Sequence, residues 1–114
     1  VDNIPVWALA ASGSDVFYSS ASSLTDAALS RVAKSGGTPQ VLVSGLVGIT
    51  VVVKDARVYV EAIDPSFHMS IWSVTTTGTG FRLITTTELD SDAIAIDDCA
   101  LYYAADLSLL RTPR

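Results

Sequence analysis

Short apolar runs alternate with polar positions along the whole chain, and turn residues separate one run from the next. The runs are rich in Val, Ile, Thr and Tyr, which favour strands. Turn residues stand at 12–15, 54–55 and 97–98, and glycines at 36, 37, 78 and 80. A weak helical period covers 26–35, but its counterpart 70–79 is full of β-branched residues, so both are predicted to be strands.

The pattern repeats about every 42 residues. Segment 9–18 matches 51–60 and 94–103, and each copy has an alternating apolar stretch, a polar turn, and then an apolar residue followed by an aromatic one. Further along, 29–36 matches 71–78 and 109–114, and a fourth element occurs twice, at 39–42 and 81–84. Four antiparallel strands in a unit of this length are typical of a propeller blade. The alternative is an ordinary β-sandwich of about 11 strands with accidental similarity.

The copies resemble the blades of six-bladed, TolB-like or NHL-like β-propellers. In those families the third strand often reads Ile-x-Arg-Val-Pro-x-x-Gly-Gly, and 29–37 reads Leu-Ser-Arg-Val-Ala-Lys-Ser-Gly-Gly here. The resemblance covers residues 6–114 and implies blades at about 6–46, 47–88 and 89–114, the last without its final strand. Such propellers include ligand binders, docking scaffolds and a few enzymes, so the resemblance implies architecture rather than function.

Three aromatic residues share one position in the repeat. They are Phe17, Tyr59 and Tyr102. We expect them to pack between blades, because each is a large apolar body. The first strand of each unit is predicted to lie near a central channel.

Composition and charge narrow the function classes. Of 114 residues, 49% are hydrophobic and 17% charged, which argues against disorder. The longest apolar stretch, 46–53, is far shorter than the about 20 residues of a membrane-spanning helix. The net charge of −5 and the scattered basic residues disfavour nucleic acids and anionic membranes as partners. Abundant Ser and Thr with scarce Lys are common in exported proteins, so an extracytoplasmic location (periplasm, cell surface or secreted) is predicted.

Few residues suggest chemistry. His68, the only histidine, could be a general base or metal ligand, but with no designed acid or nucleophile beside it we interpret it as a loop residue. Cys99, the only cysteine, cannot form an internal disulfide and is predicted to be buried. The chain has no nucleophile-elbow sequence and no phosphate-binding glycine motif. We therefore predict neither catalytic residues nor a cofactor.

The acidic residues Asp90, Asp92 and Asp97 are the calcium candidates, because closely spaced carboxylates can supply several oxygen ligands. Their spacing does not match the EF-hand loop, and Asp also favours turns, which is the alternative. Trp72 could line a groove for a glycan or peptide, as could Trp7, or it could pack against a blade edge.

These observations predict a non-enzymatic propeller scaffold or binding module that engages a protein or glycan through its blade loops. One alternative is a subunit that completes a propeller by self-association, and another is half of a propeller enzyme with catalytic residues outside this chain. The expected partner is a second copy or the remainder of a longer propeller, because the third unit ends at its third strand and leaves an unpaired edge.

Overall fold

The computed structural model describes residues 5–64, 66–87, 93–105 and 108–114. These residues form eleven β-strands and no helix, which confirms the all-β prediction. No helix among them is long and apolar enough to cross a membrane. The segment around 26–35, where a weak helical period competes, is a strand as predicted.

The strands form three separate antiparallel sheets, and none of them closes on itself. Within each sheet, every strand pairs only with strands that are adjacent to it in sequence. The first sheet contains β1 (Val6–Ser12), β2 (Asp15–Ala21), β3 (Ala27–Ala33) and β4 (Gln40–Ser44). The second contains β5 (Val47–Lys54), β6 (Arg57–Ile63), β7 (Met69–Thr75) and β8 (Arg82–Thr87). The third contains β9 (Ile94–Ile96), β10 (Ala100–Ala105) and β11 (Ser108–Pro113).

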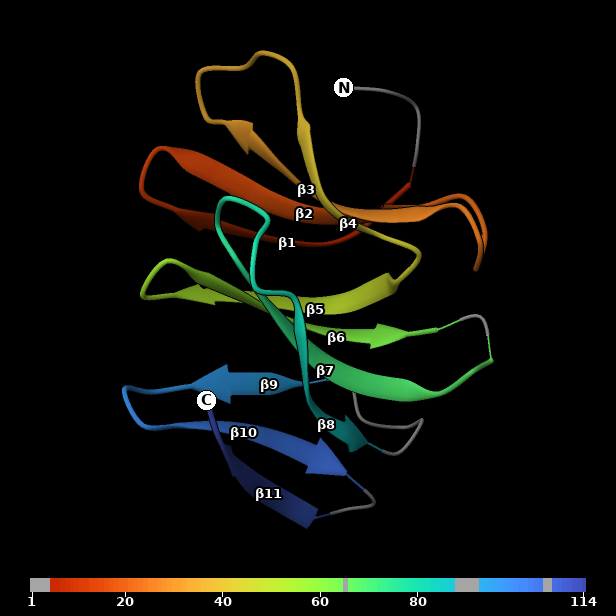
Figure 1. The fold of residues 1–114 in the computed structure, drawn as a ribbon, viewed down its shortest axis with the longest axis vertical. Coiled ribbons are helices and arrows are strands. Elements are labelled where there is room, and N and C mark those ends of the chain that lie inside the picture. The colour runs from red at the N-terminus through yellow and green to blue at the C-terminus, as the bar shows by residue number, and fades with distance from the viewer. Residues whose placement is uncertain (1–4, 65, 88–92, 106–107) are drawn as a thin grey trace.

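The sheets stack face to face in chain order, with the second sheet between the other two (Figure 1). One apolar cluster joins the first sheet to the second, and another joins the second to the third. Along β6, Val58 and Val60 belong to the first of these clusters and Tyr59 to the second. This follows because successive side chains along a β-strand point to opposite faces of the sheet.

The repeat seen in the sequence is present in the strand pairing. Leu9 pairs with Tyr18, Val51 with Val60, and Ile94 with Tyr103, which are equivalent pairs in the three sheets. The irregularities recur as well. The register shifts between Val6 and Ala8 and again between Gly48 and Thr50, 42 residues later. A second shift follows Leu29 and recurs after Ile71, so the two four-stranded sheets share their bulges as well as their strand order.

The tight turns follow the sequence prediction. Gly13 has a φ of 59° in the β1–β2 turn, where glycine meets no steric penalty. In the second sheet the equivalent turn places Asp55 and Ala56 at φ values of 52° and 60°. A side chain in this left-handed region is strained by roughly 1–2 kcal/mol, and Asp tolerates it better than Ala.

Candidate functional site

The first internal interface includes an aromatic residue and an arginine that lie on the same face of the first sheet. Phe17 on β2 pairs with Arg31 on β3. Phe17 is only 1% exposed and lies in a cluster with Val58 and Val74 of the second sheet. The Nη1 of Arg31 donates a hydrogen bond to the Thr76 carbonyl in the β7–β8 loop at 2.9 Å. An apolar centre with a polar bond at its edge therefore joins these two sheets.

The second interface repeats the apolar part of this arrangement. Tyr59 and Ile71 of the second sheet are buried against Leu101 and Tyr103 of the third. Tyr59 occupies the repeat position of Phe17, so equivalent faces meet in the two interfaces.

The edge of the second interface is more strongly charged than that of the first. The Nη2 of Arg114 lies 2.9 Å from an Asp55 oxygen, and its Nε donates to the Tyr59 hydroxyl at 3.2 Å. The hydrogen bond to the Tyr59 hydroxyl, followed by the bond to Asp55, raises the pKa of the Arg114 guanidinium group. Lys54 lies 3.0 Å from the Asp98 carboxylate, and the hydrogen bond between them raises the pKa of the Lys54 ammonium group. Both ion pairs join the β5–β6 end of the second sheet to residues of the third.

The outer face of the first sheet is apolar, and no other sheet among the described residues covers it. Leu9 on β1 is 65% exposed, and Val16, Tyr18 and Val32 beside it are half-buried. These four line a hollow of about 370 Å³. The remaining residues that line this hollow are Val6, Ala33, Lys34, Gly36 and Gly37.

No described sheet covers the outer face of the third sheet either, and side chains of β10 and β11 stand out from it. Tyr102 on β10 pairs with Arg111 on β11, and Ala104 pairs with Leu109. Leu109 is 77% exposed, the highest value among the exposed large hydrophobic residues of the described chain. The Tyr102 hydroxyl donates to an Asp97 carboxylate oxygen at 2.9 Å. Of the three aromatics predicted to pack between blades, Phe17 and Tyr59 are thus buried between sheets, and Tyr102 lies on an open face.

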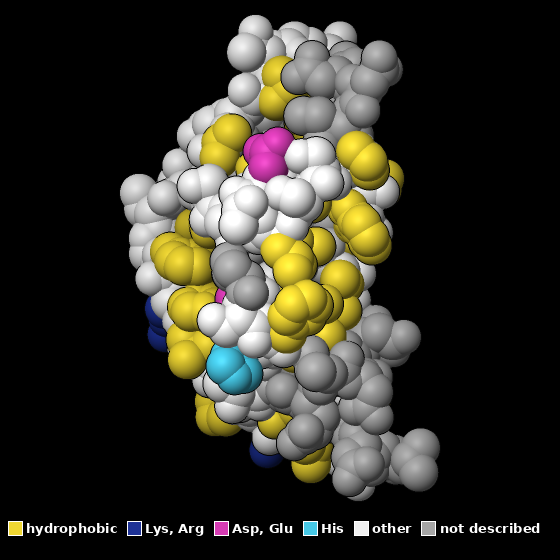
Figure 2. Space-filling view, turned by 90° about the vertical axis from the view of Figure 1, so that its right-hand side faces the viewer, with side chains coloured by type: hydrophobic (Ala, Val, Ile, Leu, Met, Phe, Trp, Pro, Cys, Tyr) yellow, Lys and Arg dark blue, Asp and Glu magenta, His cyan; other side chains and the backbone are white. Residues whose placement is uncertain are grey.

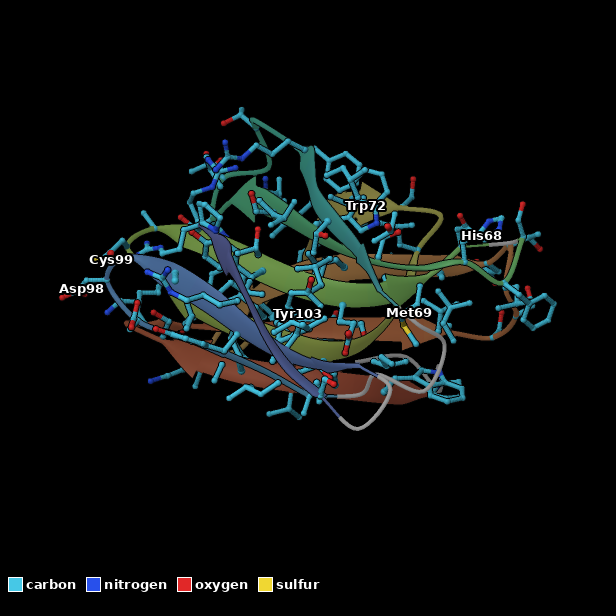
Figure 3. All side chains as sticks on the ribbon, turned by 90° about the horizontal axis from the view of Figure 1, so that it is seen from below. His68, Met69, Trp72, Asp98, Cys99 and Tyr103 are labelled. Carbon is cyan, nitrogen blue, oxygen red and sulfur yellow. The ribbon has the colours of Figure 1, made fainter. Side chains whose placement is uncertain are left out.

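His68 is exposed in the loop between β6 and β7. Its Nδ1 is 3.9 Å from an Asp64 carboxylate oxygen, and the other Asp64 oxygen accepts bonds from the backbone N–H groups of Ser66 and His68. Asp64 therefore shapes the loop. The histidine lies at the surface in Figure 2, and Figure 3 places it at the opposite end of the sheets from Cys99. The two reactive side chains do not form a common site.

Trp72 is packed rather than free. Its ring stacks on Phe81, with 4.8 Å between centroids and 13° between planes, and it borders the first apolar cluster. Trp7 is 59% exposed, and its indole N–H donates to the Ala21 carbonyl at 3.3 Å. A smaller hollow of about 270 Å³ lies beside Trp7, with Leu24 and Ile63 in its walls. Of the two tryptophans, Trp7 is therefore the better placed to contact a ligand.

Asp97 shapes the β9–β10 turn. One carboxylate oxygen accepts the N–H groups of Cys99 and Ala100, each at 2.8 Å. These bonds, that of Cys99 first, lower the pKa of Asp97, and the Tyr102 hydroxyl adds to the effect. Asp90 and Asp92 lie outside the described residues. Within the described ranges, no three His, Cys, Asp or Glu side chains are grouped so that they could hold a metal ion.

The prediction that Cys99 is buried is wrong, because this residue is exposed. It lies in the tight turn between Asp97 and β10, where the backbone reverses at the end of the sheet and leaves the side chain exposed. Sequence reasoning also assigned no role to Arg31, Arg114 or Leu109. The sequence match between 29–31 and 109–111 was the signal that could have indicated a role for Arg31 and Leu109.

No protein family model matches this chain, and the comparison with curated proteins finds no match.

Proposed function

We propose that this chain is a non-enzymatic scaffold of the propeller type, in which each sheet is one blade and the open sheet faces join further blades. The support is the repetition of strand order, register and bulges between sheets that stack in chain order. The TolB-like or NHL-like resemblance adds to this proposal, since propellers are built by radial repetition of such units.

The single observation that carries the proposal is the kind of surface left at both ends of the stack. Large apolar patches on a soluble protein mark interaction sites. Leu9 lies on one end face and Leu109 on the other, and both are largely exposed. A face that takes part in assembly is expected to be apolar in this way, whereas a catalytic cleft needs converging polar groups.

Binding of a protein or glycan through the loops is the second candidate, and exposed Trp7 beside its hollow is the observation that favours it. Trp72 contributes less, because Phe81 covers one side of its ring. The extracytoplasmic location and the reading as half of an enzyme stay predictions.

The test is the mass of the 114-residue chain in solution, measured by sedimentation over the widest accessible concentration range. Two copies with three sheets each would supply six blades at about 24 kDa, twice the 12.0 kDa of the chain. A folded chain that stays at 12.0 kDa at every concentration would contradict the proposal. Titration with soluble glycans, followed by Trp fluorescence, tests the loop-binding alternative.

A further inference from the structure

The tail face, defined as Tyr102, Leu109 and Arg111 of the third sheet, repeats a face that is buried elsewhere in the same chain. These residues occupy the repeat positions of Phe17, Leu29 and Arg31. Phe17 and Leu29 are buried in the cluster that joins the first sheet to the second. The tail face therefore carries the side chains that one sheet uses to cover the next.

The head face is defined as the outer side of the first sheet, and it is the opposite half of the same interface. Its members are Leu9, Val16, Tyr18 and Val32. They occupy the repeat positions of Val51, Val58, Val60 and Val74, all of which belong with Phe17 to the first apolar cluster. In the third sheet, Ile94, Leu101 and Tyr103 stand at three of these positions, and all three belong to the cluster around Tyr59. The structure thus contains the same junction between sheets twice. The outer faces of the first and third sheets each present one half of this junction, which no other described sheet covers.

The polar edge of the junction is also prepared on the head face. Arg31 donates to the carbonyl of Thr76, and Lys34 stands at the equivalent position in the first sheet. The two loops have the same backbone bonds: Lys34 N–H donates to the Ser14 carbonyl, and Thr76 N–H donates to that of Ala56. The backbone of the first sheet therefore holds the Lys34 carbonyl in the same way as that of the second sheet holds the Thr76 carbonyl. Arg111 stands at the repeat position of Arg31, so it is the arginine that would donate to the Lys34 carbonyl of another copy.

We infer that two copies of this chain join head to tail, with Tyr102 and Leu109 of one copy seated in the hollow of the other and Arg111 donating to the Lys34 carbonyl. This inference rests on the proposed function and names the partner and the contact. Contacts between like faces fit less well. Two heads would set one hollow against another, and two tails would bring two Arg111 side chains together, where like charges repel.

Two variants that each block one face test the inference. Leu9→Asp places a charge on the head face, and Tyr102→Asp places one on the tail face. Both residues lie outside the buried clusters, so both variants are expected to fold, which circular dichroism and melting curves check. Phe67→Asp is the matched control, because Phe67 is 61% exposed in the β6–β7 loop and belongs to neither face.

We expect the wild-type chain and Phe67→Asp to associate and each single-face variant to sediment as a monomer. An equal mixture of Leu9→Asp and Tyr102→Asp should form a 1:1 dimer, because one intact head and one intact tail remain. Arg111→Ala should weaken wild-type association by about tenfold or more, the effect of losing one charge-assisted hydrogen bond.

The outcomes separate this inference from the proposed function. A monomeric wild-type chain overturns both. A wild-type chain that associates while Tyr102→Asp associates equally well overturns the inference alone. So does a mixture that stays monomeric, or a control that dissociates like the two variants.

Discussion

The first two sheets approach each other closely at Gly48 on β5. A methyl group there would lie 2.8 Å from Cγ2 of Val60 and 2.9 Å from Cβ of Ser19. Gly48 is not among the glycines with positive φ, so its backbone accepts any residue and only the space is limiting. The substitution Gly48→Ala is therefore a direct test of how tightly the sheets are packed.

The cost follows from which atoms would have to move. Val60 is 2% exposed, so its side chain has no free space to enter. Cβ of Ser19 is attached to the backbone of β2, so relief there requires the first sheet to shift. Overpacking of this kind costs about 1–3 kcal/mol. The shift also breaks the buried hydrogen bond from the Ser19 hydroxyl to the Gly48 carbonyl, for about 1 kcal/mol more. We expect the free energy of unfolding to fall by about 2–4 kcal/mol.

Urea denaturation followed by the fluorescence of Trp7 and Trp72 measures this change, with far-UV circular dichroism in parallel. All variants are compared at the same protein concentration, since association would add apparent stability. Ser19→Gly serves as the companion substitution because it removes the side chain that the new methyl group meets. The double variant Gly48→Ala/Ser19→Gly should be more stable than the sum of the single effects by about 1 kcal/mol or more.

Two results would refute the reasoning. One is a Gly48→Ala variant within about 0.5 kcal/mol of the wild-type chain, the range of an ordinary surface substitution. The other is strict additivity in the double variant, which would mean that Ser19 and Gly48 do not limit each other.

Tyr59→Ala should lower the free energy of unfolding of the monomer by about 3–5 kcal/mol, and Tyr102→Ala should lower it by less than about 1 kcal/mol. The two effects differ because only Tyr59 is buried. Equal losses in urea denaturation would contradict this prediction. Ala56→Gly should raise the melting temperature, since it relieves a φ of 60° at a gain of about 0.5–1 kcal/mol, and an unchanged or lower melting temperature would argue against strain in that turn. The pKa of Asp97 is lower in the folded chain, so its carboxylate stabilises the fold above its ordinary pKa of 3.8 and this contribution is lost as pH falls through the folded value. Asp97→Asn should therefore flatten the loss of stability in acid, as followed by melting curves at pH values below about 5, and an identical acid profile would refute the role of Asp97.

The repeat and the strands were predictable because their signals are local. Alternation in stretches such as Val51 to Val53, and turn residues at Gly13 and Asp55, depend on the chain within a few residues. The offset of 42 residues then aligned equivalent strands, and residues that are 42 apart in the sequence also occupy equivalent places in the strand pairing. The bulges beside Gly48 and Ile71 were not predicted, since a register shift depends on the partner strand.

The surfaces were harder to predict because burial depends on what lies across a sheet. Phe17 and Tyr102 stand at one repeat position, and the same pattern describes both. One is buried and the other is not, since the second sheet covers Phe17 and no described strand covers Tyr102. The prediction for Cys99 failed for a related reason. Its small apolar side chain suggests burial, but its position in a turn leaves it exposed.

The pairing of each strand only with its neighbours in sequence has a consequence for how the chain folds. Each hairpin closes over a short loop, so little chain entropy is lost before the first contacts form. A sheet of this kind can assemble from one continuous stretch of chain, as a cooperative unit that gains or loses its structure together. Folding rates rise with the share of local contacts, so we expect this β-protein to fold faster than a sandwich of similar size, whose strands must find distant partners.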